Sequence, residues 1–277
     1  MTGKGGVGKS LIARELALEA SARGLRTTLV DAVDPADRSD EHLESGGLEL
    51  DRFVLDTGEA LHHMLARVLR FGAFADRLMD SRTFSAVAAA APGLADFVRI
   101  DYLRELAYGH VRGRRDIVIV NAPASGHCVA MLEAPQRIAE LAHRGPGATA
   151  AREARDFTTD PGTFRVGVVT LPEELPVLET AELHADLARL GVPTTITLVN
   201  GVYPALATAK QATWLEHNDV SDDARLYLSR RERQLTLTAS VTSPAGPPAV
   251  LPYLFETPCM SAADRARVFH LLCEWSQ

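Results

Sequence analysis

Eight consecutive residues near the start of the chain have the types and spacing of a phosphate-binding loop. They read Gly3-Lys4-Gly5-Gly6-Val7-Gly8-Lys9-Ser10 and fit the pattern G-x-x-x-x-G-K-[ST]. Glycines at these positions let backbone N–H groups turn inward around a phosphate, and the helix that follows points its positive end at the same anion. In this pattern Lys9 brings its charge to the β- and γ-phosphates, and the Ser10 hydroxyl is a magnesium ligand. The segment therefore predicts binding of a nucleoside triphosphate with Mg²⁺.

Two carboxylates follow the next apolar run, Thr27 to Val30. Hydrolysis needs a water molecule in line with the γ-phosphate, and a carboxylate beside it can orient or deprotonate that water. We take Asp34 as the candidate for this role and for contact with magnesium, directly or through water. Asp31 is a second carboxylate that could support magnesium-bound water. Both also have a simpler interpretation as helix caps or turn formers.

The elements that must position these residues alternate between apolar β-type runs and helical patterns, which is typical of a parallel sheet with crossover helices. The expected strands are 27–30, 116–120, 165–170, 194–199 and 250–255, and the expected helices include 9–23, 177–190 and 262–275. Gly24 and Gly191 stand where helix caps are expected. We expect a three-layer α/β fold with a mainly parallel sheet and a helical cap region.

The chain of 277 residues suits one domain, 1–277. Residues 59–110 have apolar residues at helical spacing and predict a helical subdomain, and 131–163 predict a possible further helical excursion. Only Met1 and Thr2 precede the glycine loop, so the strand that normally feeds such a loop is missing from the sequence. We expect either a misassigned or truncated start, which we favour, or a sheet without its central strand. In the second case nucleotide binding is weakened and some strand edges are unpaired.

A second lysine, Lys4, lies inside the loop and resembles the deviant Walker A group of P-loop proteins. That group includes the MinD, ParA, ArsA and nitrogenase iron-protein families. The resemblance implies that Lys4 reaches across a dimer interface to the partner's nucleotide. The alternative is a solvated loop lysine.

Further segments resemble ArsA and the ATPases that target tail-anchored membrane proteins. Asp34-Pro35-Ala36-Asp37-Arg38-Ser39-Asp40 is similar to their switch I, and Asn121-Ala122-Pro123-Ala124-Ser125-Gly126-His127 is similar to their switch II. The resemblance continues through Asn200 to about Phe255. It implies that Asn200 contacts adenine, that the segment around Pro252 lines the other side of the base, and that the protein binds ATP and Mg²⁺ as a dimer.

Asn121 departs from the family pattern, which has aspartate there to hold magnesium through water. A neutral amide oxygen supports a metal less well, so we expect slow or absent hydrolysis while binding survives. Gly126 and His127 complete the switch II segment. His127 either senses the γ-phosphate or is a packed structural histidine.

The sequence gives weaker signals for the particular branch of this family, metalloid pump or tail-anchored targeting factor. Cys128, Cys259 and Cys273 are scattered, whereas a soft-metal site needs several converging thiolates, so we do not expect a metalloid pump. The C-x-x-C zinc staple of tail-anchored targeting factors is absent, and the methionines are too dispersed for a methionine-lined groove. Residues 59–110 either cradle an apolar client helix or form an ordinary cover on the sheet.

Composition limits the remaining classes. The formal net charge of −7 argues against a broad nucleic-acid surface, and no apolar run approaches the roughly 18 residues of a membrane span. The sequence has neither a signal peptide nor a cysteine framework, which favours a cytoplasmic protein with at most peripheral membrane contact.

We therefore expect a Mg-ATP-binding dimeric ATPase, homo- or heterodimeric, whose slow hydrolysis opens and closes the dimer as a switch for a client or partner. One alternative is a catalytically weak regulatory subunit in a heterodimer, for which Asn121 is the reason. Another is a positioning switch similar to MinD and ParA. A metabolic kinase would need an acceptor site, for which we find no candidate.

Overall fold

A computed structural model describes residues 1–32, 50–69, 91, 93–142, 144–206, 208, 211, 214, 221–255 and 260–273. The strands are β1 (Thr2–Gly3), β2 (Thr27–Asp31), β3 (Leu50–Val54), β4 (Ile117–Asn121), β5 (Val166–Thr170), β6 (Thr194–Val202) and β7 (Ala249–Pro252). The helices are α1 (Lys9–Ala22), α2 (Thr57–Leu69), α5 (Leu94–Ala107), α6 (Ser125–Leu141), α7 (Pro146–Thr159), α8 (Glu174–Arg189), α10 (Asp222–Ser240) and α11 (Ala262–Cys273).

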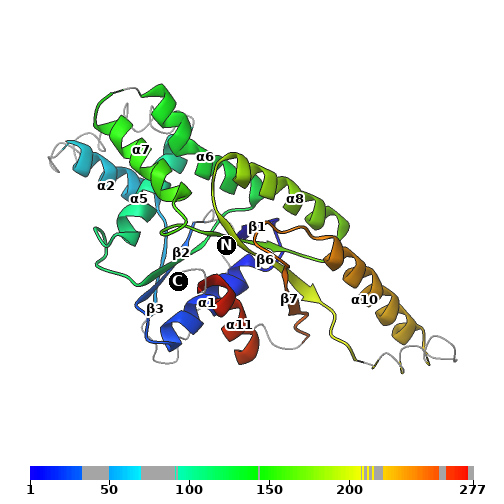
Figure 1. The fold of residues 1–277 in the computed structure, drawn as a ribbon. Helices are drawn as coiled ribbons and strands as arrows, with labels where there is room; N and C mark the ends of the chain where they lie inside the picture. Colours follow the sequence, from blue (N-terminus) through cyan, green and yellow to red (C-terminus); the bar gives the residue numbers. More distant parts are fainter. Residues whose placement is uncertain are drawn as a thin grey trace.

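All strand pairs in the described part of the chain are parallel, as the alternating pattern predicts. The strands form a three-stranded sheet in the order β3-β2-β4 and a four-stranded sheet in the order β1-β5-β6-β7. Because parallel strands need crossovers, helices cover both faces, and Figure 1 shows them on either side of the strands. The expected α/β fold of the P-loop class is confirmed.

Among the described residues, the two largest apolar cores lie on the two faces of the sheets. On one face α1 and α11 pack on each other and on the strands, with Ile12, Leu16 and Phe269 buried. On the other face α2, α5, α6, α7 and α8 share a larger core that includes the buried Phe97 and Leu187. This gives the three layers expected from the sequence.

The sequence patterns placed most elements correctly, with exceptions at β1, β3 and β7. β3 was not predicted, because Asp51 and Arg52 interrupt its apolar residues. The strand nevertheless pairs along its whole length with β2, from Thr27 opposite Leu50 to Asp31 opposite Val54. The last strand, β7, ends at Pro252, so the expected extension to Phe255 is wrong.

The predicted helix caps are confirmed. Gly24 has φ 82° and Gly191 has φ 70°, and each follows its helix in the left-handed conformation that favours glycine. The Gly24 N–H donates to the Ser21 carbonyl and the Gly191 N–H donates to the Ala188 carbonyl.

The two sheets meet at the first residues of the chain. β1 has only two residues, and it pairs with β5 through Thr2 opposite Val168 and Gly3 opposite Val169. On its other side, the Met1 amine donates to the Val120 carbonyl over 2.6 Å, and the Ala122 N–H donates to the Met1 carbonyl. The sequence analysis expected no strand before the glycine loop, whereas the structure has this short one.

Most of the described residues of 59–110 are helical and belong to α2 and α5. Two buried charges on α5 hold the neighbouring helices: Asp101 accepts from Arg67 of α2 over 2.6 Å, and Arg104 lies 3.1 Å from Glu153 of α7. The helical interpretation of 131–163 falls on α6 and α7.

Helix α10 projects from the body of the molecule (Figure 1), and none of its residues is buried. Within the described residues, no helix is both long and apolar enough to cross a membrane.

Candidate functional site

The glycine loop has the backbone geometry that its sequence predicts. Gly6 has φ 81° and Gly8 has φ 92°, values that side chains other than glycine rarely adopt. A Cβ on Gly6 would have open space around it, whereas one on Gly8 would lie 2.4 Å from Nδ2 of Asn200. Gly8 is the N-cap of α1, so the N–H groups of the loop lie at the positive N-terminal end of that helix.

Lys9 is folded over this loop. It is only 9% exposed, and its Nζ donates to the Lys4 carbonyl over 2.7 Å. The ammonium group therefore lies beside the backbone that would surround a phosphate. Val7 is fully buried beneath, and its carbonyl accepts a hydrogen bond from Nδ2 of Asn200 over 2.9 Å.

Asn121 links the loop to the end of β2. Its Nδ2 donates to the Ser10 hydroxyl over 3.1 Å and to Oδ1 of Asp31 over 2.9 Å. The other oxygen of Asp31 accepts from Nε of Arg52 over 2.8 Å. A carboxylate can only accept hydrogen bonds, so the contact with Asp31 fixes which end of the amide is Nδ2.

That orientation leaves Oδ1 of Asn121 buried without a hydrogen-bond partner. Magnesium prefers oxygen ligands, and three oxygen-bearing side chains meet here: Ser10, Asp31 and Asn121. This donor set fits Mg²⁺: the Ser10 hydroxyl and the Asn121 amide oxygen are neutral donors, and the Asp31 carboxylate is the anionic one. Among the described residues, no cluster of three or more His, Cys, Asp or Glu side chains could hold a metal.

Lys4 makes an ion pair within its own chain. Its Nζ lies 2.8 Å from Oε1 of Glu179 on α8, and both side chains are about one third exposed. The lysine that the resemblance assigns to a partner's nucleotide is therefore held, in this structure, over its own α8.

The expected adenine residues lie at the carboxyl ends of β6 and β7. Asn200 is half-buried next to Gly8, and Pro252 is the last residue of β7. Beside them Tyr203, Tyr253 and Phe255 form an aromatic group, with the Tyr253 and Phe255 ring centroids 4.9 Å apart. The sequence patterns did not single out these aromatic residues.

The switch segments are only partly described. Asp34 and the rest of the switch I segment lie outside the described residues. Gly126 and His127 are exposed in the first turn of α6, so His127 is not packed in the core. Of the cysteines, Cys128 is buried, and burial raises the pKa of its thiol.

Comparison with known proteins decides the family of this fold and site. The profile of the anion-transporting ATPase family, ArsA, matches residues 1–145. The chain belongs to the ArsA ATPase family. The match includes the glycine loop, β2, β3 and the switch II segment.

Several curated members of the ArsA ATPase family and its relatives resemble the chain beyond this region. ATPase BagA of Mycobacterium tuberculosis (strain ATCC 25618 / H37Rv) is 30% identical, with 74% of this chain and 65% of that protein covered. An arsenical pump-driving ATPase of Escherichia coli is 30% identical, with 69% and 32% covered. ATPase GET3C of Arabidopsis thaliana is 23% identical, with 73% and 66% covered. The chain thus spans slightly less than two thirds of the length of its mycobacterial relative.

Sequence reasoning missed two charged partners of the site, Arg52 and Glu179. Arg52 lies in the strand that the patterns did not predict, and Glu179 is one of several acidic residues on an ordinary amphipathic helix. Only the pairing of β3 with β2 and the packing of α8 beside the loop bring them to Asp31 and Lys4. No local signal in the sequence marks either contact.

Proposed function

We propose that this ArsA-family chain binds Mg-ATP at Gly3–Ser10 and acts as a slow, dimeric ATPase switch for a client or partner protein. The carrying observation is the loop itself: left-handed Gly6 and Gly8 open onto the N-terminus of α1, with the Lys9 ammonium folded over the loop. Such a loop has room and charge for a triphosphate.

Each side chain then has a role in the proposal. Lys9 neutralises the β- and γ-phosphates, and Ser10 holds Mg²⁺ with help from Asp31 and the Asn121 oxygen. Asp34 orients the attacking water, a role that rests on the family resemblance. Asn200 and the segment at Pro252 contact the adenine base of the nucleotide. Magnesium, when bound, supplies the positive charge that offsets the charge on the transferred phosphoryl group.

Slow turnover follows from Asn121. An amide in place of a carboxylate removes one negative charge from the metal site, and its N–H₂ group is already bonded to Ser10 and Asp31. Both features weaken magnesium support without closing the phosphate loop. This is also the observation that favours the second candidate function, a regulatory subunit that binds ATP while a related partner hydrolyses it.

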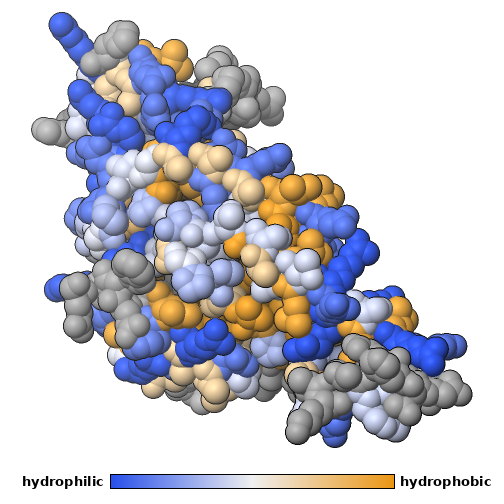
Figure 2. Space-filling model, turned by 45° about the vertical axis from the view of Figure 1, so that its right-hand side comes forward, coloured by the Kyte–Doolittle hydropathy of each residue, from blue (hydrophilic) through white to orange (hydrophobic). Residues whose placement is uncertain are grey.

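The dimer is proposed from Lys4 and the surface around it. Leu175 and Leu178 on α8 are 57% and 63% exposed, and Glu179 on the same helix holds Lys4. Figure 2, which brings this side of the molecule forward, shows hydrophobic side chains among hydrophilic ones over the face. Apolar side chains next to a charged loop are what an interface that closes over nucleotide would present.

Isothermal titration with Mg-ATP, combined with sedimentation velocity in Mg-ATP, Mg-ADP and no nucleotide, tests the proposal. We expect binding that Lys9→Ala weakens at least tenfold, together with a dimer that forms with ATP and dissociates with ADP. Phosphate release separates the two candidates. Slow release by the isolated chain supports the ATPase, whereas ATP-dependent dimers without any release support the regulatory subunit. Absence of Mg-ATP binding would refute both.

A further inference from the structure

An arginine on β3 holds the carboxylate of the candidate magnesium site. Nε of Arg52 lies 2.8 Å from Oδ2 of Asp31, whereas Asn121 contacts the other oxygen, Oδ1. In the register of the sheet Arg52 lies opposite Leu29. Leu29 and Asp31 are two residues apart on β2 and share a face, so a long side chain at position 52 reaches Asp31 from the neighbouring strand. Both oxygens of Asp31 therefore accept from a hydrogen-bond donor.

The oxygen-bearing side chains of the site carry a single negative charge, and Arg52 balances it. Ser10 and Asn121 are neutral, so the charge belongs to Asp31 alone. Only 10% of the Asp31 side chain is exposed, and a carboxylate removed from water needs a compensating cation or hydrogen bonds. Arg52 supplies the positive charge that Mg²⁺ would supply when bound. The arginine and the metal ion thus have the same carboxylate as their partner.

The position of Arg52 allows it to leave this carboxylate. Among the described strands β3 pairs with β2 alone, at the edge of its sheet, and 36% of the Arg52 side chain is exposed. A guanidinium group at such an edge can turn into water on its flexible stem. Asn121, in contrast, is only 2% exposed and is fixed between Ser10 and Asp31. Because two cations at one carboxylate repel each other, Arg52 is the group that moves when a metal ion arrives.

We propose that Arg52 is the counter-ion of Asp31 in the metal-free protein and releases this carboxylate when Mg²⁺ binds with ATP. The inference rests on the proposed function, because it needs the metal site beside the phosphate loop. Arg52 acts on the metal through Asp31 and is therefore a positioning residue. It keeps a buried carboxylate compensated while nucleotide is absent, and by competing with Mg²⁺ it lowers the affinity of the site for the metal.

Removal of the arginine should affect the metal-free and the metal-bound protein differently. In Arg52→Ala we expect the thermal midpoint in EDTA to fall by about 2 to 4 °C, and we expect excess Mg²⁺ without nucleotide to restore at least half of this loss. The dissociation constant of ATP in EDTA, divided by that in excess Mg²⁺, should rise about three- to tenfold. Calorimetry measures both quantities. Arg52→Lys keeps the charge and should give a ratio close to that of the unchanged chain.

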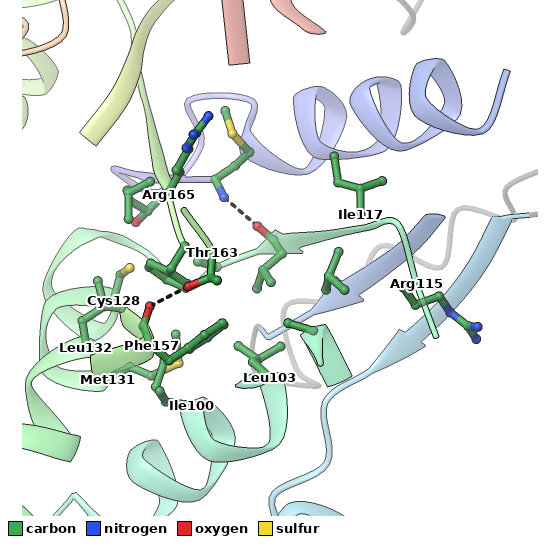
Figure 3. A pocket seen from close by; sticks show the side chains of 18 of the residues that line it. Ile100, Leu103, Arg115, Ile117, Cys128, Met131, Leu132, Phe157, Thr163 and Arg165 are labelled. Atoms are coloured by element: carbon green, nitrogen blue, oxygen red, sulfur yellow. Dashed lines mark hydrogen bonds between the residues drawn. The ribbon is translucent and has the colours of Figure 1, made fainter. Parts of the chain in front are cut away.

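A second arginine–aspartate pair on β3 provides the matched control. Nη2 of Arg115 lies 2.9 Å from Oδ2 of Asp51. Asp51 precedes Arg52 and lies on the opposite face of the strand. Figure 3 shows Arg115 beside the start of β4, with its guanidinium group pointing away from Ile100 and Leu103. Arg115→Ala should lower the thermal midpoint equally in EDTA and in Mg²⁺ and leave the ratio of ATP dissociation constants unchanged.

The same substitution in an Asp31→Asn background shows whether Arg52 acts through Asp31. There Arg52→Ala should leave the ratio unchanged, because the shared carboxylate is gone. A rise of equal size in that background would overturn the proposal, since Arg52 would then repel the metal directly.

Two further outcomes separate this inference from the proposed function. If Mg-ATP binds but Arg52→Ala loses as much stability in Mg²⁺ as in EDTA and keeps its ratio, Arg52 is merely structural. If the unchanged chain does not bind Mg-ATP, the proposed function fails. The thermal midpoints in EDTA and in Mg²⁺ alone then still decide the role of Arg52, and equal losses would overturn it.

Discussion

The Nζ of Lys4 lies 2.8 Å from Oε1 of Glu179, so the second lysine of the loop is paired with its own chain. In the proposed dimer this lysine serves the partner's nucleotide, and it must first leave Glu179. The two states compete, and the ion pair biases the chain towards the monomer. Because both side chains are about one third exposed, the pair contributes at most about 1 kcal/mol.

Glu179→Gln is therefore expected to strengthen ATP-dependent dimerisation by up to about fivefold for each subunit that carries the change, while altering stability by less than about 1 kcal/mol. Sedimentation equilibrium in Mg-ATP measures the dimer constant. Glu182→Gln is the matched control, since Glu182 is an exposed carboxylate on the same helix. Equal dimer constants for the two variants would contradict the idea that Glu179 competes with the partner subunit for Lys4.

The Asn121→Asp variant tests the metal site. It would place a second carboxylate where Nδ2 now lies 2.9 Å from Oδ1 of Asp31, and two carboxylates at that distance repel. We expect a loss of about 1 to 3 kcal/mol in unfolding free energy in EDTA, largely restored by Mg²⁺, and faster phosphate release. Asn121→Ala is the control, because it removes the same hydrogen bonds without adding charge. If magnesium stabilises both variants equally, the site does not hold the metal.

Alanine substitutions at two glycines of the loop should differ in their effect on the free energy of unfolding. Gly8→Ala forces a side chain into φ 92° with its Cβ 2.4 Å from Nδ2 of Asn200, so the Asn200 bond to Val7 should be lost. We expect a destabilisation of about 2 to 4 kcal/mol, combining strain and the lost hydrogen bond. Gly5 has no atom within 4 Å of an added Cβ, so Gly5→Ala should change stability by less than about 1 kcal/mol. Urea denaturation of both variants makes the comparison, and similar losses would contradict the loop geometry.

The buried amine of Met1 predicts a pH dependence. Desolvation lowers its pKa from 8.0 to about 6, partly offset by Cys128 and reinforced by Lys9. Between these values the unfolded chain binds more protons than the folded one, so stability rises with pH. The gain from pH 6 to pH 8 should be about 2 kcal/mol.

Chemical denaturation across this range measures the rise. Burial also lowers the pKa of His184, with the same sign, but that contribution ends at about pH 6.5, the ordinary value of the group. The Nα-acetylated protein has no amine to titrate and is the control. A profile from pH 7 to pH 8 that is equally steep after acetylation would exclude Met1 as its source.

Much of the fold was predictable because it depends on local patterns. Alternating apolar runs and helices identified the parallel α/β fold, and Gly24 and Gly191 marked two helix ends correctly. β3 was not predicted because Asp51 and Arg52 interrupt its run of apolar residues. Its strand conformation depends on pairing with β2. A charged residue can occupy a strand when its partner lies on the neighbouring strand, and Arg52 meets Asp31 in this way.

The sequence by itself determined the phosphate loop, since Gly6, Gly8 and Lys9 act through backbone freedom and charge within eight consecutive residues. Only the tertiary structure decided what those residues touch. Asn121 reaches Ser10 across 111 positions, Lys4 reaches Glu179 across 175, and Asn200 reaches Val7 across 193. Contacts over such separations depend on strand order and helix packing, which no local spacing encodes.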